Sequence, residues 1–163
     1  MKKWILFLML ILTVQIGHRI VPGIAQEDID AQEIKKVIEA FLENFMYKKL
    51  DPAMEQVSAN YYVKTNDNNV VDYEKFRSKT GKLINAFSQK YTDYTIIDVK
   101  VFKLDVQGNK ASAEISYNWK GFNLDTLTEE SGKVEKLVYL AKEQGSWKIT
   151  MWERFQAPIR KGG

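Results

Sequence analysis

Carboxylates and tyrosines are the side chains left for acid–base chemistry in this chain, because its only histidine is His18 and it has no cysteine. Glu153 is the most interesting carboxylate. It follows Trp147, Ile149 and Met151 at two-residue spacing, so a strand would place all four side chains on one face. A carboxylate at the mouth of an apolar interior has a raised pKa and can act as a base or hold a cation. In the alternative, the strand has reached its rim and Glu153 is solvated. The sequence offers no catalytic residue beyond this weak candidate.

Aromatic residues on the predicted strands could line a ligand pocket. Tyr117, Trp119 and Tyr139 each combine an apolar ring with a polar group that can bond a ligand. Tyr61 is a weaker candidate of the same kind, at the end of a predicted short helix. The alternative is an ordinary core whose hydroxyl groups reach water at its edge. The predicted pocket therefore contains Tyr61, Tyr117, Trp119, Tyr139, Trp147, Met151 and Glu153.

The sequence predicts neither a metal site nor a cofactor. Zinc sites are built mainly from Cys and His, which the chain lacks outside its first residues. A Ser-His-Asp or Cys-His catalytic pair is excluded for the same reason. Met46, Met54 and Met151 are interpreted as core residues that fill gaps.

The first 25 residues have the layout of a secretory signal peptide. A Lys-Lys pair precedes the apolar run WILFLMLILTV, and the tripeptide ending at Ala25 places small residues at the −3 and −1 positions. The run is shorter than the about 20 residues of an ordinary spanning helix. We expect export to the periplasm or the cell exterior. In the alternative that the signal is not cleaved, residues 4–16 anchor the protein in the membrane.

Removal of this segment changes the charge balance of the chain. Residues 1–25 hold three of the 24 basic side chains and none of the 21 acidic ones, so the mature chain has 21 of each. The formal charge of +3 therefore belongs to the signal, and it gives no reason to expect nucleic acid or anionic lipid as a partner.

The mature chain divides into a helical and a strand-rich part. Residues 26–33 are a polar lead-in, and within them Asp30 and Glu33 are predicted to form a capping box. Apolar residues then recur at the spacing of an amphipathic helix. A short helix begins at Asp51-Pro52, and Asp72 caps a third helix. From Tyr94 the period changes to two, with a β-bulge near Val101-Phe102 and turns at 107–110 and 144–145. We predict an α+β domain over residues 34–155 and a flexible tail, residues 156–163.

The architecture follows from this order of elements. Short turns join four long strands, which implies an antiparallel sheet, and a small hairpin flanks the TNDNN segment. One face of such a sheet needs a cover, which the three helices supply. Trp147 and Trp152 are five residues apart and point to opposite faces of a regular strand. We therefore predict that Val138, Leu140 and Trp152 form an apolar partner surface on the outer face.

Three stretches carry a resemblance to a known superfamily. They are KKLDPAMEQVSANYYV, DYEKFRSKTGKLINAF, and the meander from QGNKASAEISY to the strand SWKITMWE. Over about Ile34 to Phe155 the chain resembles the nuclear transport factor 2-like superfamily, which includes ketosteroid isomerases and SnoaL-like cyclases. The resemblance implies a cone formed by a curved sheet and its helices, whose mouth often holds a ligand. It also implies a homodimer that pairs through the outer sheet face. It transfers no catalytic residue.

Three functions fit these observations. The first is a non-catalytic binding domain that takes a small apolar ligand or a protein through the cone or the sheet. The second is an isomerase, cyclase or dehydratase that uses a carboxylate and a tyrosine. The third is a structural subunit with a filled cone. An open cone with an acid inside favours the enzyme, and an open, uncharged cone favours the binding domain, which we expect.

Overall fold

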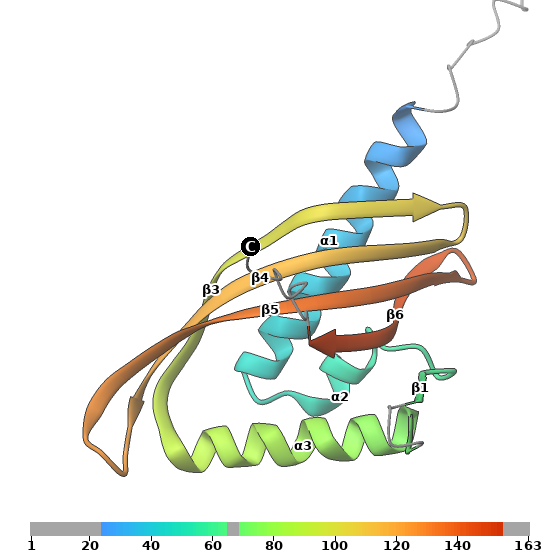
Figure 1. Cartoon of the computed structure of the whole chain (residues 1–163). Coiled ribbons are helices and arrows are strands. Elements are labelled where there is room, and N and C mark those ends of the chain that lie inside the picture. The colour runs from blue at the N-terminus through green and yellow to red at the C-terminus, as the bar shows by residue number, and fades with distance from the viewer. Residues whose placement is uncertain (1–23, 65–68, 155–163) are drawn as a thin grey trace, which may run out of the picture.

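The computed structural model describes residues 24–64 and 69–154, and the predicted tail and nearly all of the predicted signal peptide lie outside these ranges. The chain forms helices first and strands afterwards (Figure 1). The elements are α1 (Ile24–Met46), α2 (Leu50–Met54), β1 (Tyr62–Lys64), β2 (Val70–Asp72), α3 (Tyr73–Lys90), β3 (Tyr91–Gln107), β4 (Lys110–Asn123), β5 (Thr128–Glu143) and β6 (Ser146–Arg154). Among the described helices, none is both long and apolar enough to span a bilayer.

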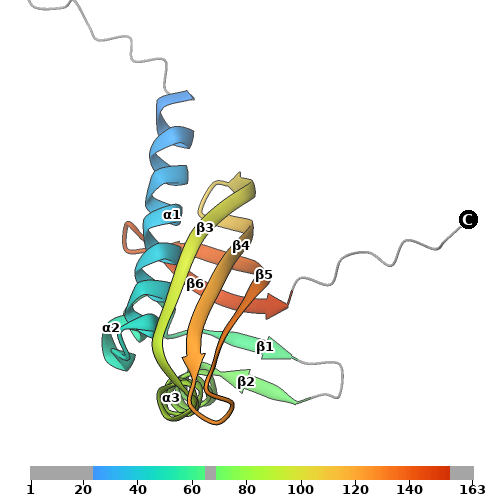
Figure 2. The same ribbon diagram turned by 90° about the vertical axis from the view of Figure 1, so that its left-hand side faces the viewer.

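The predicted α+β architecture is confirmed. Strands β3 to β6 form a four-stranded sheet in chain order with antiparallel pairs, and β1 and β2 form the small hairpin. The sheet is curved: α1 crosses one face, and α3 runs beneath the far ends of β3, β4 and β5 (Figure 1). Seen from the side, α1 lies against one face of the sheet, and no helix covers the other face (Figure 2). We call the face toward α1 the inner face and the other the outer face.

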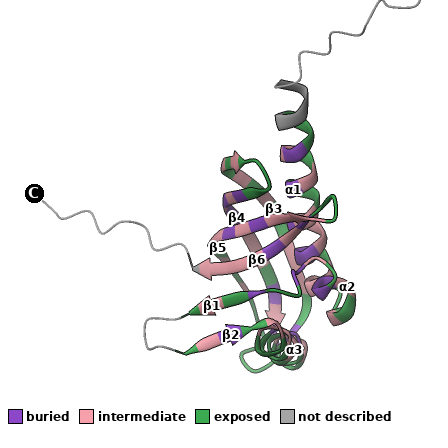
Figure 3. Ribbon diagram, turned by 90° about the vertical axis from the view of Figure 1, so that its right-hand side faces the viewer, coloured by how far each residue is buried: buried purple, intermediate pink, exposed green. Residues whose placement is uncertain are grey.

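The core lies between α1 and the inner face. The apolar stripe of α1 supplies Ile34, Ile38, Phe41 and Leu42, of which Ile34 and Ile38 have no exposed surface. The sheet supplies Ala111, Ala113, Ile115, Val138, Leu140, Trp147 and Ile149. Figure 3 shows these buried positions alternating with half-buried and exposed ones along the strands, as the two-residue period requires.

The helix starts agree with the sequence only in part. Asp72 caps α3 as predicted, because its side chain accepts a hydrogen bond from the Lys75 backbone N–H at 2.9 Å. The predicted capping box at Asp30 is wrong, since α1 is already helical from Ile24 through the whole predicted lead-in. Asp51 lies inside α2 and does not cap it; its carboxylate instead pairs with Arg77 of α3.

β-Bulges bend the long strands. The bulge predicted near Val101-Phe102 is confirmed by the register shift between Val101 and Lys103, and β3 has two further shifts nearer its start. The turn at Gln144-Gly145 has positive φ at both residues, 49° and 84°, as in the tight turns that join twisted antiparallel strands.

Candidate functional site

A bulge in β6 decides which side chains enter the interior. Tyr139 faces Met151 and Leu140 faces Ile149, so Thr150 has no partner in the pairing of β5 with β6. An extra residue reverses the alternation beyond it. As a result, Trp147 and Ile149 before the bulge and Trp152 after it all belong to the inner face.

The predicted partner surface is therefore wrong. Val138 has no exposed surface, Leu140 is 2% exposed, and both belong to the core beneath α1. The Trp152 ring packs on Phe41 of α1, with ring centroids 4.8 Å apart. The prediction failed because the strand was taken to alternate without interruption, which placed this phase on the outer face.

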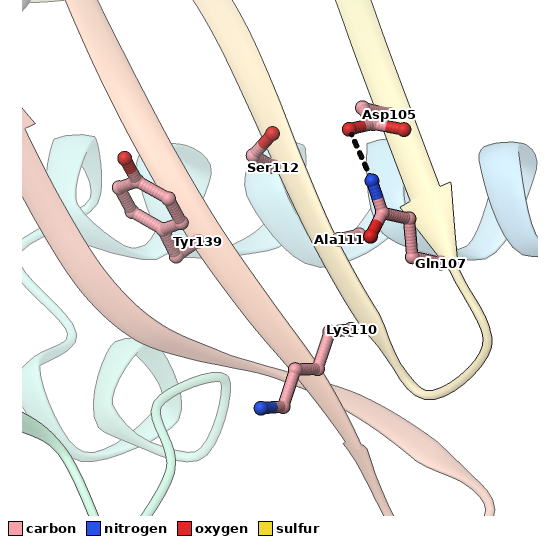
Figure 4. Close-up of a pocket in the computed structure, with 6 residues that line it drawn as sticks. All are labelled: Asp105, Gln107, Lys110, Ala111, Ser112 and Tyr139. Atoms are coloured by element: carbon pink, nitrogen blue, oxygen red, sulfur yellow. Dashed lines mark hydrogen bonds between the residues drawn. The ribbon is translucent and has the colours of Figure 1, made fainter.

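Three predicted pocket residues lie outside the interior: the bulge turns Met151 and Glu153 outward, and Tyr139 lies between the buried Val138 and Leu140 of β5. Met151 pairs with Tyr139 and Glu153 pairs with Leu137, on the outer phase of β5. Tyr139 faces Ser112 of β4, and with it borders an outer-face hollow of about 210 Å³. Figure 4 shows the side chains around this hollow, with Gln107 bonded to Asp105 and α1 behind the strands. Glu153 thus does not share a face with Trp147.

The remaining predicted pocket residues face the interior. Tyr61 is 3% exposed, stacks on Phe76 at 4.3 Å between ring centroids, and accepts a hydrogen bond from the Trp152 N–H at 3.2 Å. Burial, opposed by that N–H and aided by the charge of Glu153, raises the pKa of Tyr61 to about 12. Trp147 is 2% exposed and donates its indole N–H to Asp30, so it anchors the core.

Trp119 belongs to an aromatic cluster at the α3 end of the sheet. Its ring stacks on Tyr94 at 5.8 Å and meets Tyr91 edge-on at 5.5 Å. Phe87 of α3 contacts the same tyrosines, at 4.9 Å from Tyr94 and 5.7 Å from Tyr91. Next to it, Phe45, Ile84, Phe87 and Tyr94 border a cavity of about 10 Å³. Neither Tyr91 nor Tyr94 was predicted as a site residue, although two tyrosines at the start of a long strand are a usable signal.

Two tyrosine hydroxyls in this interior have no hydrogen-bond partner in the described part of the chain: those of Tyr94 and Tyr117. Burial, followed by the charge of Tyr91, raises the pKa of Tyr94 to about 12. Burial also raises the pKa of Tyr117, followed by the charge of Tyr94. Both hydroxyls are therefore protonated at neutral pH and available as donors to a bound molecule.

One carboxylate touches the aromatic cluster. Glu130 of β5 accepts hydrogen bonds from the Tyr91 hydroxyl at 2.7 Å and from Asn123 Nδ2 at 2.5 Å. These bonds, with the charge of Lys90, lower the pKa of Glu130 against its partial desolvation. A carboxylate with a lowered pKa is a poor general base, so Glu130 holds the cluster in place.

The described ranges contain no group of three Asp, Glu, His or Cys side chains arranged to hold a metal ion. The interior instead presents rings and neutral hydroxyls. Such a lining suits a molecule that is largely apolar and has at least one hydrogen-bond acceptor.

Comparisons with known proteins show which solved structures share the fold of this chain. No family model and no curated protein sequence matches the chain. A nuclear transport factor 2-like superfamily protein from Salmonella enterica aligns with 15% identity over 84% of this chain and 99% of its own, at a TM-score of 0.60.

Two further solved structures agree. A function-unknown protein from Mycobacterium tuberculosis aligns at 11% identity over 86% of this chain and 79% of its own, with a TM-score of 0.64. A conserved protein from Planctomyces limnophilus aligns at 11% identity over 81% and 99%, with a TM-score of 0.63. At these identities the likeness concerns the fold alone. The chain therefore has the cone-shaped fold of the nuclear transport factor 2-like superfamily.

Proposed function

We propose that this protein is an exported, non-catalytic binding domain whose cone takes a small, mostly apolar molecule. The observation that carries the proposal is the pair of donor hydroxyls, Tyr94 and Tyr117, in an aromatic interior without hydrogen-bond partners among the described residues. Both tyrosines are half-buried, so their hydroxyls are not sealed from solvent and a ligand can reach them. A ligand with a carbonyl, ether or anionic oxygen would satisfy both groups.

The electrostatics of these hydroxyls favour binding over acid–base catalysis. An isomerase, cyclase or dehydratase of the carboxylate and tyrosine type needs an acid close to a reacting tyrosine. The charges that act on the pKa of Tyr94 and Tyr117 are those of other tyrosines. Two acids do act on other tyrosines of the interior. The charge of Glu153 acts on Tyr61, whose hydroxyl already accepts the Trp152 N–H, and Glu130 bonds Tyr91 with a lowered pKa.

Removal of the two hydroxyls tests the proposal. We expect Tyr94→Phe and Tyr117→Phe each to weaken binding several-fold, up to about tenfold, because each loses one hydrogen bond but keeps its ring. Native mass spectrometry of the purified protein would identify a copurified ligand, and 1-anilinonaphthalene-8-sulfonate is a fluorescent probe with apolar rings and an acceptor group.

Two variants on the outer phase serve as controls. Tyr139→Phe and Glu153→Gln should bind the same probe with wild-type affinity, since neither side chain faces the interior. Wild-type affinity in the Tyr94→Phe, Tyr117→Phe double variant would contradict the proposal. A loss in Glu153→Gln would favour the enzyme.

Export is part of the proposal and has its own test. We expect the exported protein to begin at Gln26, because the small residues before it fit a signal peptidase site. N-terminal sequencing of protein from the periplasmic or culture fraction checks this. A membrane-bound protein that retains residues 4–16 would instead support the anchored alternative.

A protein partner on the outer face is the second candidate. The apolar side chains on that face include Leu137, Tyr139 and Met151, which replace the three core residues predicted from the sequence. All three are half-buried and belong to the outer phase of the sheet. A homodimer through this face therefore stays a proposal with a changed set of residues.

A further inference from the structure

The hollow on the outer face lies across three strands. Asp105 of β3 is paired with Ser112 of β4, and Ser112 is paired with Tyr139 of β5, so the three side chains form one row across the sheet. Figure 4 shows Ser112 between the other two. Because the serine side chain is short and its neighbours are long, the row leaves an open space of about 210 Å³ over β4.

Several polar groups at this hollow have no hydrogen-bond partner within residues 24–64 and 69–154. They are the hydroxyls of Ser112 and Tyr139 and the ammonium group of Lys110. Asp105 accepts a hydrogen bond at Oδ2 from Gln107 Nε2 at 3.0 Å, which leaves its Oδ1 as an acceptor. None of these five residues is buried. The hollow therefore offers donors and an acceptor side by side to a molecule that enters it.

One aromatic ring borders these polar groups. Tyr139 is the aromatic member of the lining, and its ring contacts no other ring in the part of the chain that the structure describes. A half-buried tyrosine presents a flat apolar surface together with a hydroxyl. The hollow thus suits a small molecule that has one apolar face and several polar groups around it.

We propose that this hollow binds a neutral pyranose sugar. The C–H groups on one face of a pyranose ring pack on the Tyr139 ring, and the sugar hydroxyls, which both donate and accept, bond the polar groups around it. Lys110 and Ser112 donate to the sugar, and Asp105 accepts from it. The two charged side chains of the lining, Lys110 and Asp105, have opposite signs, so the site favours a ligand without net charge.

The size of the hollow limits the occupant to one ring. Pockets for drug-sized molecules begin at about 300 Å³, and this hollow, at about 210 Å³, is smaller. The occupant is therefore a free monosaccharide or the terminal ring of a longer glycan. The site is also separate from the cone, because Tyr139 belongs to the outer phase of β5, whereas Tyr117 faces the interior.

Saturation-transfer difference NMR with glucose, galactose and N-acetylglucosamine tests the site. We expect the ring protons of at least one sugar to receive saturation from the wild-type protein. Tyr139→Ala should weaken binding about tenfold, because the packing surface is lost, whereas Tyr139→Phe keeps the ring and should weaken it only a few-fold. Tyr62→Ala is the matched control and should bind like the wild type, since Tyr62 is 57% exposed and does not line the hollow. An equal loss in Tyr62→Ala would overturn the proposal.

Asp105→Asn tests the polar part of the site at an exposed position, where folding is not at stake. It should weaken binding several-fold, because a neutral amide accepts a hydrogen bond less strongly than a carboxylate. Cosedimentation with insoluble chitin and cellulose, without a signal from free sugars, would identify a glycan end as the occupant. Binding to neither sugars nor polymers, or undiminished binding in Tyr139→Ala, would overturn the proposal. Tyr139→Ala should still bind 1-anilinonaphthalene-8-sulfonate in the cone, so the two sites can fail separately.

Discussion

Trp152→Ala is expected to lower the free energy of unfolding by about 3 kcal/mol, because it removes a large side chain that packs against the core. The reason is the bulge at Thr150, which turns Trp152 to the inner face, where it packs on Phe41. Urea denaturation followed by fluorescence of the remaining tryptophans measures the effect. The slope of the unfolding free energy against urea concentration should stay unchanged if the folded state keeps its compactness.

The adjacent residue provides the control. Met151 belongs to the outer phase and is half-buried, so Met151→Ala should cost well under half as much, about 1 kcal/mol or less. If β6 alternated without a bulge, the order of the two costs would be reversed. A larger loss in Met151→Ala than in Trp152→Ala would therefore contradict the inner position of Trp152.

Asp30→Ala is expected to cost about 2–3 kcal/mol, in the range for a buried hydrogen bond to a charged group. Asp30 is 7% exposed and lies in the second turn of α1. It accepts from the Trp147 indole N–H at 3.0 Å and from Lys142 Nζ at 2.7 Å, which ties α1 to the β5–β6 hairpin. The bond from Lys142 to Asp30 also raises the pKa of Lys142.

Two comparisons distinguish the loss of the Asp30–Trp147 hydrogen bond from the mere loss of a negative charge on α1. Asp28→Ala, two residues earlier and exposed, should change stability by about 0.5 kcal/mol or less. In a double-mutant cycle, Asp30→Ala and Trp147→Phe should couple by about 1 kcal/mol, since each removes the same hydrogen bond. Independent effects of the two substitutions would show that Asp30 acts through other contacts.

Trp152 and Asp30 show which features of the fold can be predicted from local sequence patterns and which cannot. The sequence by itself predicted the order of helices and strands, the antiparallel pairing and the helix cap at Asp72, because each depends on residues near one another in the chain. Tyr61, Tyr117 and Trp119 lie in the interior, and their predicted role as pocket residues stays a prediction. Tyr117 and Trp119 follow Ala113 and Ile115 in an uninterrupted two-residue period of β4, whereas Tyr61 lies in the connection between α2 and β1.

The tertiary structure decided the positions that depend on distant segments. The strand residues 146–154 could alternate regularly or with a bulge, and the choice was made by the fit of Trp147, Ile149 and Trp152 against α1. Asp30 has the residue type of a helix cap, yet it lies inside the helix because Lys142 and Trp147 stabilise its carboxylate there. A bulge or a buried ion pair gains its stability from partners more than a hundred residues away, and this energy is not encoded in local periodicity.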